Sequence, residues 1–364
     1  MGTITRNFAN NIVTGGKVDG TDGLTGTIPA SNVANDTLGN LTAFPATVGD
    51  FVEVTASDVP ASPSTLGQLF YNSTSGTLKG VQTLGAWSSG GNMSTARSSG
   101  AGAGASVSSG LVFGGGSTPV RNLSEEYDGT SWTAGGNLGT ARYRIAGVGT
   151  QTASLATGGE VQPGSIPTPA TEEYNGTSWT SGGGFPVGVQ RIQMAGTQTA
   201  AVAGGANGNF PPSYLTNTSA EYNGTSWTGT GSVNTARYGG GGAGSQTAGV
   251  IFAGRTPSPQ ALTEEYNGSS WTSVNNMNTA RAPISSAVQA PQTDALGFAA
   301  GTATENYDGT SWSTNPATLS ISSGDRAGFG VSTSAVAAGG YDGGDITTTE
   351  EYAFSAANVT LTTS

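Results

Sequence analysis

The sequence contains no cysteine and no histidine among its 364 residues, and only two lysines, Lys17 and Lys79. Without cysteine the chain has neither disulfides nor thiolate nucleophiles. Without histidine it has no Ser-His-Asp triad and no histidine general base, and the two absences together exclude Cys/His zinc sites. We therefore predict no catalytic residue, no metal site and no cofactor.

Charge is also scarce, and most of it is negative. Charged residues make up 10% of the chain, and the net charge is −11. Because phosphate binding needs clustered Lys and Arg, we expect no nucleic-acid partner. The N-terminus lacks the apolar stretch of a signal peptide, and no apolar run reaches the roughly 18 residues of a membrane helix. We expect a protein that is neither inserted into a membrane nor exported by the general secretory route.

Glycine is abundant, with 60 copies. A Gly in a helix interior costs roughly 1 kcal/mol relative to Ala, so the composition argues against long helices. Short apolar runs that end in Gly, such as residues 111–115 and 250–254, are too short for helices and typical of strands. The sequence therefore predicts an all-β protein.

One phrase recurs along the chain, first as Glu-Tyr-Asp-Gly-Thr-Ser-Trp-Thr at residues 126–133 and again from Glu173, Glu221, Glu265 and Asn306. Three residue types follow this repeat at intervals of 41 to 49 residues. They are Trp87, Trp132, Trp179, Trp227, Trp271 and Trp312; Tyr127, Tyr174, Tyr222, Tyr266, Tyr307 and Tyr352; and Arg97, Arg142, Arg191, Arg237, Arg281 and Arg326. Periods of about 40–50 residues are typical of propeller blades.

Each repeat predicts four strands: one at the Arg, one at the apolar run that ends in Gly, one at Glu-Tyr and one at Trp. The Asp-Gly or Asn-Gly pair between the last two strands predicts a hairpin with a type I′ turn, which needs positive φ at both central residues. Repeated four-stranded sheets predict a propeller, with Gly and Ala on inner strands and the Tyr and Trp rings between sheets.

The two ends of the repeat complement each other. The first element is the strand around Trp87, and the last is Glu350-Glu351-Tyr352, which lacks a following Trp strand. We predict that residues 85–364 form six blades, and that the strand around Trp87 completes the sixth. A competing closure uses residues 358–362 as the outer strand of that blade.

The repeat resembles a kelch-type blade, with Gly-Gly after the second strand, Tyr in the third and Trp in the fourth, over residues 85–352. Three positions depart from that pattern: Gly254-Arg255 and Ala300-Gly301 replace Gly-Gly, and Asn306 replaces Glu. The resemblance implies a six-bladed kelch-like β-propeller.

Residues 1–84 lack the repeat and are rich in turn-forming residues. We expect extended chain, a short strand at 48–54, and a hairpin that pairs 68–71 with 77–79. Residues 26–33 and 67–74 are similar to stretches of bacteriophage tail-fibre and other virion appendage proteins. That resemblance implies a homo-oligomeric phage protein on the tail or capsid surface, made in the host cytoplasm, with residues 1–84 bound to other virion proteins.

Several side chains are candidates for chemistry. The six repeat arginines either pair with carboxylates of their own blades, which we favour, or form a positive funnel for an anionic glycan. In the Glu-Glu pairs the two side chains point to opposite faces of a strand, so we expect one paired and one solvated glutamate, not an acid/base pair. Asp342 and Asp345 lack further calcium-ligand spacing, which favours a plain loop.

The segments that break the repeat connect the second and third strands, and their candidate binding residues are Phe210, Tyr214 and Arg255. We hypothesise a non-enzymatic virion protein whose propeller binds a host-surface glycan or protein through these loops. The alternative is a purely architectural capsid-decoration or tail-connector protein without a receptor. A carbohydrate-active enzyme is the least favoured class.

Overall fold

The computed structural model describes residues 53–59, 68–116, 118–208 and 215–360, and these residues form strands, bridges and turns without a helix. No membrane-spanning helix therefore occurs within those ranges. The chain divides into two compact units, residues 85–354 and residues 1–84 with 355–364. Residues 355–364, which we expected within the propeller, are thus grouped with the N-terminal residues.

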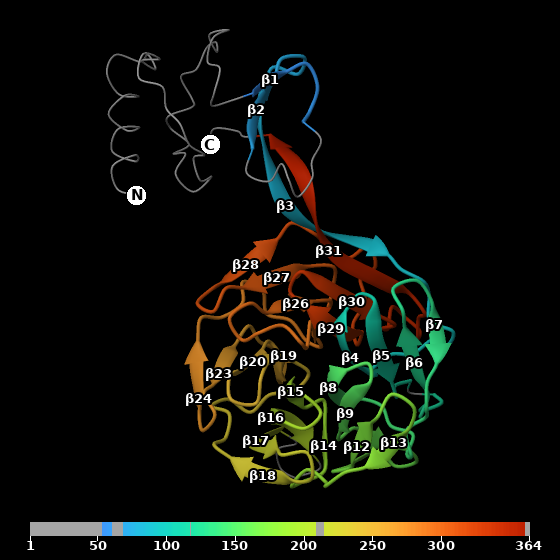
Figure 1. Cartoon of the computed structure of the whole chain (residues 1–364). Helices are drawn as coiled ribbons and strands as arrows, with labels where there is room; N and C mark the ends of the chain where they lie inside the picture. The colour runs from blue at the N-terminus through green and yellow to red at the C-terminus, as the bar shows by residue number, and fades with distance from the viewer. Residues whose placement is uncertain (1–52, 60–67, 117, 209–214, 361–364) are drawn as a thin grey trace. The chain divides into compact units, whose positions relative to one another are not determined.

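Residues 85–354 form a six-bladed β-propeller, which confirms the predicted fold class (Figure 1). The innermost strands of blades 1 to 6 are β4 (Ala101–Ser106), β8 (Ala146–Thr150), β15 (Gln193–Gly196), β19 (Gly241–Gly244), β25 (Ser285–Ser286) and β29 (Ala327–Val331). The second strands are β5 (Ser109–Phe113), β9 (Ala153–Thr157), β16 (Ala201–Gly208), β20 (Gly249–Phe252), β26 (Leu296–Phe298) and β30 (Ser334–Ala338).

The third and fourth strands carry the repeated phrase. The third strands are β6 (Ser124–Tyr127), β12 (Thr171–Tyr174), β17 (Leu215–Tyr222), β23 (Thr263–Tyr266), β27 (Thr304–Tyr307) and β31 (Thr349–Thr360). The outer strands are β7 (Trp132–Ala134), β13 (Trp179–Ser181), β18 (Trp227–Thr230), β24 (Trp271–Val274), β28 (Trp312–Asn315) and β3 (Thr77–Ser89). Neighbouring strands of blades 1 to 5 are antiparallel, as the short connections require.

Three shorter additions lie in the connections. Blade 3 gains β14 (Val189–Gln190), which pairs with β16. The connections between second and third strands form small hairpins in blade 2, from β10 (Glu160–Val161) and β11 (Ile166–Pro167), and in blade 4, from β21 (Arg255–Thr256) and β22 (Ser258–Pro259). These hairpins interrupt the sequence repeat without disturbing the four-stranded sheets.

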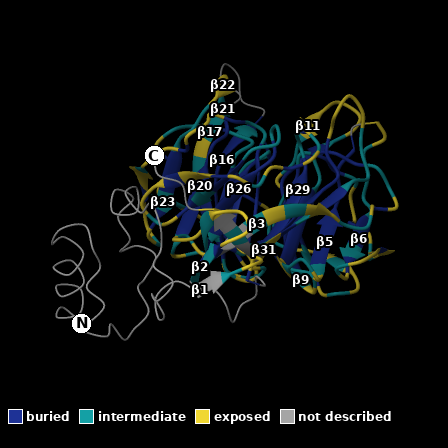
Figure 2. Ribbon diagram, turned by 90° about the horizontal axis from the view of Figure 1, so that it is seen from above, coloured by how far each residue is buried: buried dark blue, intermediate teal, exposed yellow. Residues whose placement is uncertain are grey.

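The inner strands contact one another in a closed circuit, from β4 through β8, β15, β19, β25 and β29 back to β4. Small residues make this approach possible. A methyl group added to Gly102 would lie 2.5 Å from the Gly328 carbonyl oxygen, and one added to Gly242 would lie 2.2 Å from that of Met194. Figure 2 shows the second and inner strands, such as β5, β20 and β29, as largely buried.

Two local predictions are wrong. The innermost strand is the Ala/Gly stretch, while the repeat Arg lies in the loop before it, as Arg97 lies before β4. The last hairpin is not a type I′ turn, because Gly129 has a φ of +94° but Asp128 does not have a positive φ. Instead, the Asp128 carboxylate accepts hydrogen bonds from the backbone N–H groups of Thr130 and Ser131, which closes a four-residue loop.

The strand around Trp87 closes the ring. Strand β3 is the neighbour of β31, and the Trp87 indole N–H donates to Thr304 Oγ1 of blade 5 at 2.9 Å. The Trp87 ring also contacts Phe298 and Tyr352, with centroids 4.9 and 5.2 Å away. Residues 358–360 continue the third strand β31, so the competing closure by residues 358–362 is wrong.

In the smaller unit, β1 (Glu53–Thr55) pairs in parallel with β2 (Leu69–Asn72), and β2 forms the predicted hairpin with β3. Val59, Phe70 and Val81 form its buried cluster. Of the strand expected at 48–54, residues 48–52 lie outside the described residues.

We predict that Trp87→Ala lowers the free energy of unfolding by about 2–4 kcal/mol, because it removes a half-buried ring and a hydrogen bond at the closure of the propeller. Urea denaturation monitored by fluorescence measures this change. The matched control is Ile166→Ala, whose side chain is 50% exposed and which we expect to change stability by less than about 0.5 kcal/mol. A Trp87→Ala protein as stable as the control would contradict the assigned closure.

Candidate functional site

Five of the six repeat arginines form buried ion pairs with the first glutamate of the Glu-Glu pair or its equivalent. The pairs are Arg97–Glu125, Arg142–Glu172 (2.7 Å), Arg237–Glu264, Arg281–Glu305 (3.0 Å) and Arg326–Glu350 (2.6 Å). No side chain among them is more than 6% exposed. Burial lowers the pKa of these guanidinium groups, and the glutamate partners oppose that shift. These charges hold the loop before each inner strand and are not available to a ligand.

Blade 3 lacks this ion pair. Val189 occupies the place of the arginine, as the backbone hydrogen bonds show. The Arg142 carbonyl oxygen accepts from the Gly115 N–H, and the Val189 carbonyl oxygen accepts in the same way from the Gly159 N–H. Ala220 stands where the other blades have the paired glutamate, and both residues are fully buried in one apolar cluster. An apolar pair thus replaces the ionic pair at this point of the ring, and Arg191 has a different role.

The second glutamate of each pair links adjacent blades. It accepts a hydrogen bond from the tyrosine of the following blade, as Glu126 does from Tyr174 (2.6 Å) and Glu221 from Tyr266 (2.7 Å). The other links are Tyr127–Glu351, Tyr222–Glu173 and Tyr307–Glu265. Where Asn306 replaces the glutamate, the Asn315 side-chain amide donates hydrogen bonds to Asn306 Oδ1 and to the Tyr352 hydroxyl. The expectation that this glutamate is only solvated is therefore wrong.

The tryptophans make a second set of links between blades. Each indole N–H donates to a Ser or Thr hydroxyl on the third strand of the preceding blade, at 2.9 to 3.0 Å. The acceptors are Thr304, Thr349, Ser124, Thr171, Ser219 and Thr263. The six repeat tyrosines are at most 1% exposed, so they support the architecture and are not platforms for sugars.

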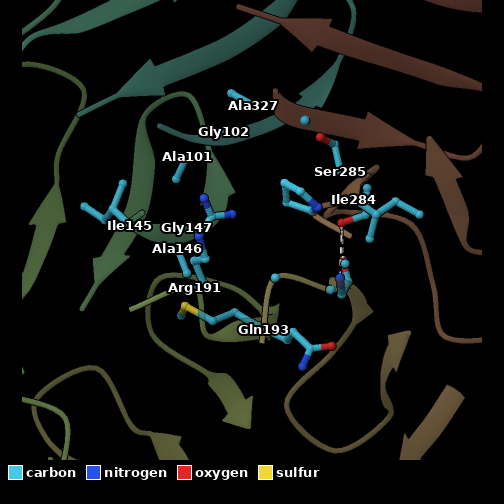
Figure 3. Close-up of a pocket in the computed structure, with 18 of the residues that line it drawn as sticks. Ala101, Gly102, Ile145, Ala146, Gly147, Arg191, Gln193, Ile284, Ser285 and Ala327 are labelled. Carbon is cyan, nitrogen blue, oxygen red and sulfur yellow. Dashed lines mark hydrogen bonds between the residues drawn. The ribbon is translucent and has the colours of Figure 1, made fainter. Parts of the chain in front are cut away.

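An axial cavity of about 120 Å³ opens where the inner strands begin. Figure 3 shows residues of the inner strands around it, among them Gly102, Gly147, Gln193 and Ser285. The residue two positions before each inner strand lies on the rim of this cavity. These rim residues are Ser99, Arg144, Arg191, Gly239, Pro283 and Asp325. The charged residues that line the cavity are Arg144, Arg191 and Asp325 of the rim and Arg326, whose guanidinium pairs with Glu350.

Arg191 and Asp325 form a bidentate ion pair across the ring, between blades 3 and 6. The two N–O distances are 2.6 and 3.1 Å. Both residues adopt left-handed backbone conformations, with φ of +52° and +56°, and Ser99 and Arg144 of the same rim do so as well. Arg191 is therefore a rim residue, and the prediction that it belongs with the other repeat arginines is wrong.

A second cavity of about 260 Å³ adjoins this rim. Its lining includes three arginines, Arg144, Arg191 and Arg255, and three neutral polar residues, Gln190, Asn207 and Tyr238. The two cavities share five lining residues at the rim and are therefore adjacent there: Arg144, Arg191, Gly239, Pro283 and Asp325. We call this second cavity, with its three arginines, the rim depression.

Two of the three guanidinium groups have carboxylate partners. Arg191 pairs with Asp325, and Arg144 Nη1 lies 2.8 Å from Glu160 Oε2. Burial opposes ionisation of Glu160, but hydrogen bonds from Tyr143 and Ser165 and the charge of Arg144 outweigh it and lower the pKa of Glu160. Arg255 has no carboxylate within 4.0 Å among the described residues, and its buried Nε has no hydrogen-bond partner there.

Of the three predicted binding residues, Arg255 lies in this depression, whereas Phe210 and Tyr214 lie outside the described residues. Sequence reasoning missed Arg144, Gln190 and Asp325. Arg144 could have been found, since it is a second arginine two residues after a repeat arginine. Asp325 could not, because its role depends on a partner 134 residues away across the ring.

The Asp342–Asp345 loop does not gather further metal ligands. Asp345 accepts a hydrogen bond from Ser98 Oγ at 2.7 Å. Across the described ranges no three His, Cys, Asp or Glu side chains lie close enough to hold a metal ion.

No protein-family model matches the chain, and no curated protein matches it significantly.

Blade 3 suggests a test of the buried ion pairs. We predict that Glu264→Ala alone lowers the free energy of unfolding by about 3–5 kcal/mol, because it leaves Arg237 buried without its carboxylate. The double substitution Arg237→Val with Glu264→Ala copies the Val189–Ala220 pair and should cost less than the sum of the two single changes. Denaturation of both single variants and the double variant measures the coupling. Additive losses would contradict the proposed equivalence.

The tyrosines predict a loss of stability at alkaline pH. Burial, together with the bonded glutamate, raises the pKa of Tyr127, Tyr174 and Tyr266 from 10.0 to about 12. The folded state therefore holds these protons more strongly than the unfolded state, and the resulting stabilisation falls as the pH rises from about 10 to about 12. Phenolate absorbance and urea denaturation across this range measure both effects. Titration of every tyrosine near pH 10 in folded protein would contradict the prediction.

Proposed function

We propose that this chain is a structural protein of a phage particle, of the tail-fibre or appendage type, whose kelch-like propeller binds a glycan or protein on the host surface. In this proposal residues 1–84 attach the chain to other virion proteins and the assembly is homo-oligomeric. The support from the sequence is the similarity of residues 26–33 and 67–74 to virion appendage proteins and of the blade repeat to kelch repeats.

One observation supports the binding role: Arg144, Arg191 and Arg255, which lie outside the repeated contacts between blades, line one cavity at one end of the propeller axis. Inner strands start at this end, and connections between second and third strands return to it, as the bridges Tyr143–Glu160 and Tyr238–Arg255 show. The repeated Tyr, Trp and Glu residues link each blade to the next, whereas Arg144, Arg191 and Arg255 lie outside this repeated set of contacts. Concave sites with a few convergent polar groups, set on a rigid scaffold, are where proteins typically bind ligands.

Two measurements test this function. Antibodies against the full-length chain should label the surface or tail of phage particles that encode it, as seen by electron microscopy. The labelled full-length protein should also adsorb to host cells of that phage and compete with the phage for them. Labelled particles without adsorption would favour the architectural role, and a protein absent from the particles would overturn the proposal.

A further inference from the structure

We infer that the depression at the propeller rim is a subsite for the carboxylate of an acidic sugar, with Arg255 as the principal anion-binding group. The inference deepens the proposed function and rests on it for its biological setting, because it names the ligand class of the same site. Its physical basis is separate and lies in the charges, the neutral polar groups and the size of the cavity.

The charge of Arg255 is not balanced within the site. Arg144 and Arg191 have Glu160 and Asp325, and the five framework arginines have their glutamates, but Arg255 has no carboxylate among the described residues. A partly buried guanidinium loses hydration and regains that free energy when an anion binds it. In a chain with a net charge of −11, a cavity with an excess of positive charge is a local exception.

Arg121 shows that lack of a partner is not enough to make a site. Like Arg255, it has no carboxylate within 4.0 Å among the residues that the structure describes, and its Nε is buried without a partner. Arg121 lines neither cavity, however, whereas Arg255 lines the larger one beside Arg144 and Arg191. Among the residues that the structure describes, Arg255 is therefore the arginine that combines an unbalanced guanidinium with a place in a cavity lining.

The existing ion pair directs an incoming anion toward Arg255. Asp325 holds both terminal nitrogens of Arg191, at 2.6 and 3.1 Å, and its negative charge repels a second carboxylate near that side of the rim. Arg144 donates to Glu160 and Gln190 through Nη1, its guanidinium lies over the Tyr143 ring at 4.9 Å, and its other terminal nitrogen makes no hydrogen bond within the described residues. Arg255 and the outer part of Arg144 are the groups that remain for a ligand.

The neutral groups favour a sugar acid over a simple anion. Planar guanidinium groups match the two oxygens of a carboxylate. Asn207 has an amide that can donate to and accept from hydroxyl groups, the Gln190 amide accepts from Arg144 through Oε1 and can still donate, and Tyr238 lines the same cavity. A volume of about 260 Å³ lies just below the roughly 300–1,000 Å³ of sites for drug-sized ligands, which suits one sugar unit at the end or side of a polysaccharide.

The test is a titration of the full-length protein at low ionic strength with sodium galacturonate, galactose, methyl galacturonate ester and inorganic phosphate, followed by ligand-observed NMR. We expect galacturonate to bind at least about tenfold more tightly than galactose or the ester, and added salt to weaken it. Equal binding of galacturonate and galactose, or no binding of galacturonate, would overturn the inference. Tighter binding of phosphate would instead assign the site to phosphorylated ligands and also overturn it.

Three variants locate the site. Arg255→Gln should weaken galacturonate binding at least about tenfold, while Arg121→Gln, which removes the same charge outside both cavities, should leave it unchanged. Asp325→Asn should strengthen it a few-fold, because it removes the repelling charge and frees Arg191. Thermal unfolding of each variant shows whether it is folded; Arg255 makes no side-chain hydrogen bond among the described residues, so its removal should not unfold the propeller. Unchanged binding by Arg255→Gln would overturn the assignment.

The outcomes separate this inference from the proposed function. If the wild-type protein adsorbs to host cells and Arg255→Gln adsorbs equally well, the virion role stands and the sugar-acid subsite is wrong. If galacturonate binds in an Arg255-dependent way but the protein neither labels particles nor adsorbs, the subsite stands and the virion role is wrong.

Discussion

The structure depends on the contact that each blade makes with the blade before it. A four-stranded sheet of mostly Gly, Ala, Ser and Thr buries little apolar surface by itself, and its stability comes from the interface with its neighbours. Here every interface receives a tryptophan N–H bonded to a hydroxyl and a tyrosine hydroxyl bonded to a carboxylate or an amide. Because the sixth interface is made by the strand of Trp87, the ring of blades is closed.

The buried charges belong to this framework. A buried arginine and glutamate satisfy each other and the loop backbone, but an apolar pair serves in blade 3, where Val189 and Ala220 pack together. That agrees with the general finding that a buried ion pair adds little net stability over a well-packed apolar pair, although losing one partner is costly. An arginine repeated once per blade is therefore poor evidence for an anion-binding funnel, because its regularity reflects the construction of the blade.

Ligand binding is better sought among the residues that do not belong to the repeated contacts between blades. Arg144, Arg191 and Arg255 are such residues, and all three reach one depression from blades 2, 3 and 4. The rigid ring sets their positions, while connections of different length and composition supply their side chains. In this depression the charges of Arg191 and Arg144 are neutralised by Asp325 and Glu160, and the excess positive charge is that of Arg255.

The amino-acid sequence alone determined the all-β class, the six blades and their closure at Trp87, because periodic Tyr, Trp and Gly positions reflect contacts that repeat in every blade. It also indicated Arg255 as a departure from the repeat. Only the tertiary structure decided that Arg191 leaves the series of buried pairs, that Asp325 is its partner, and that Arg144 and Arg255 share a cavity. The physical reason is that these residues meet across the axis, where closure of the ring brings together chain segments whose separation in sequence carries no periodic signal.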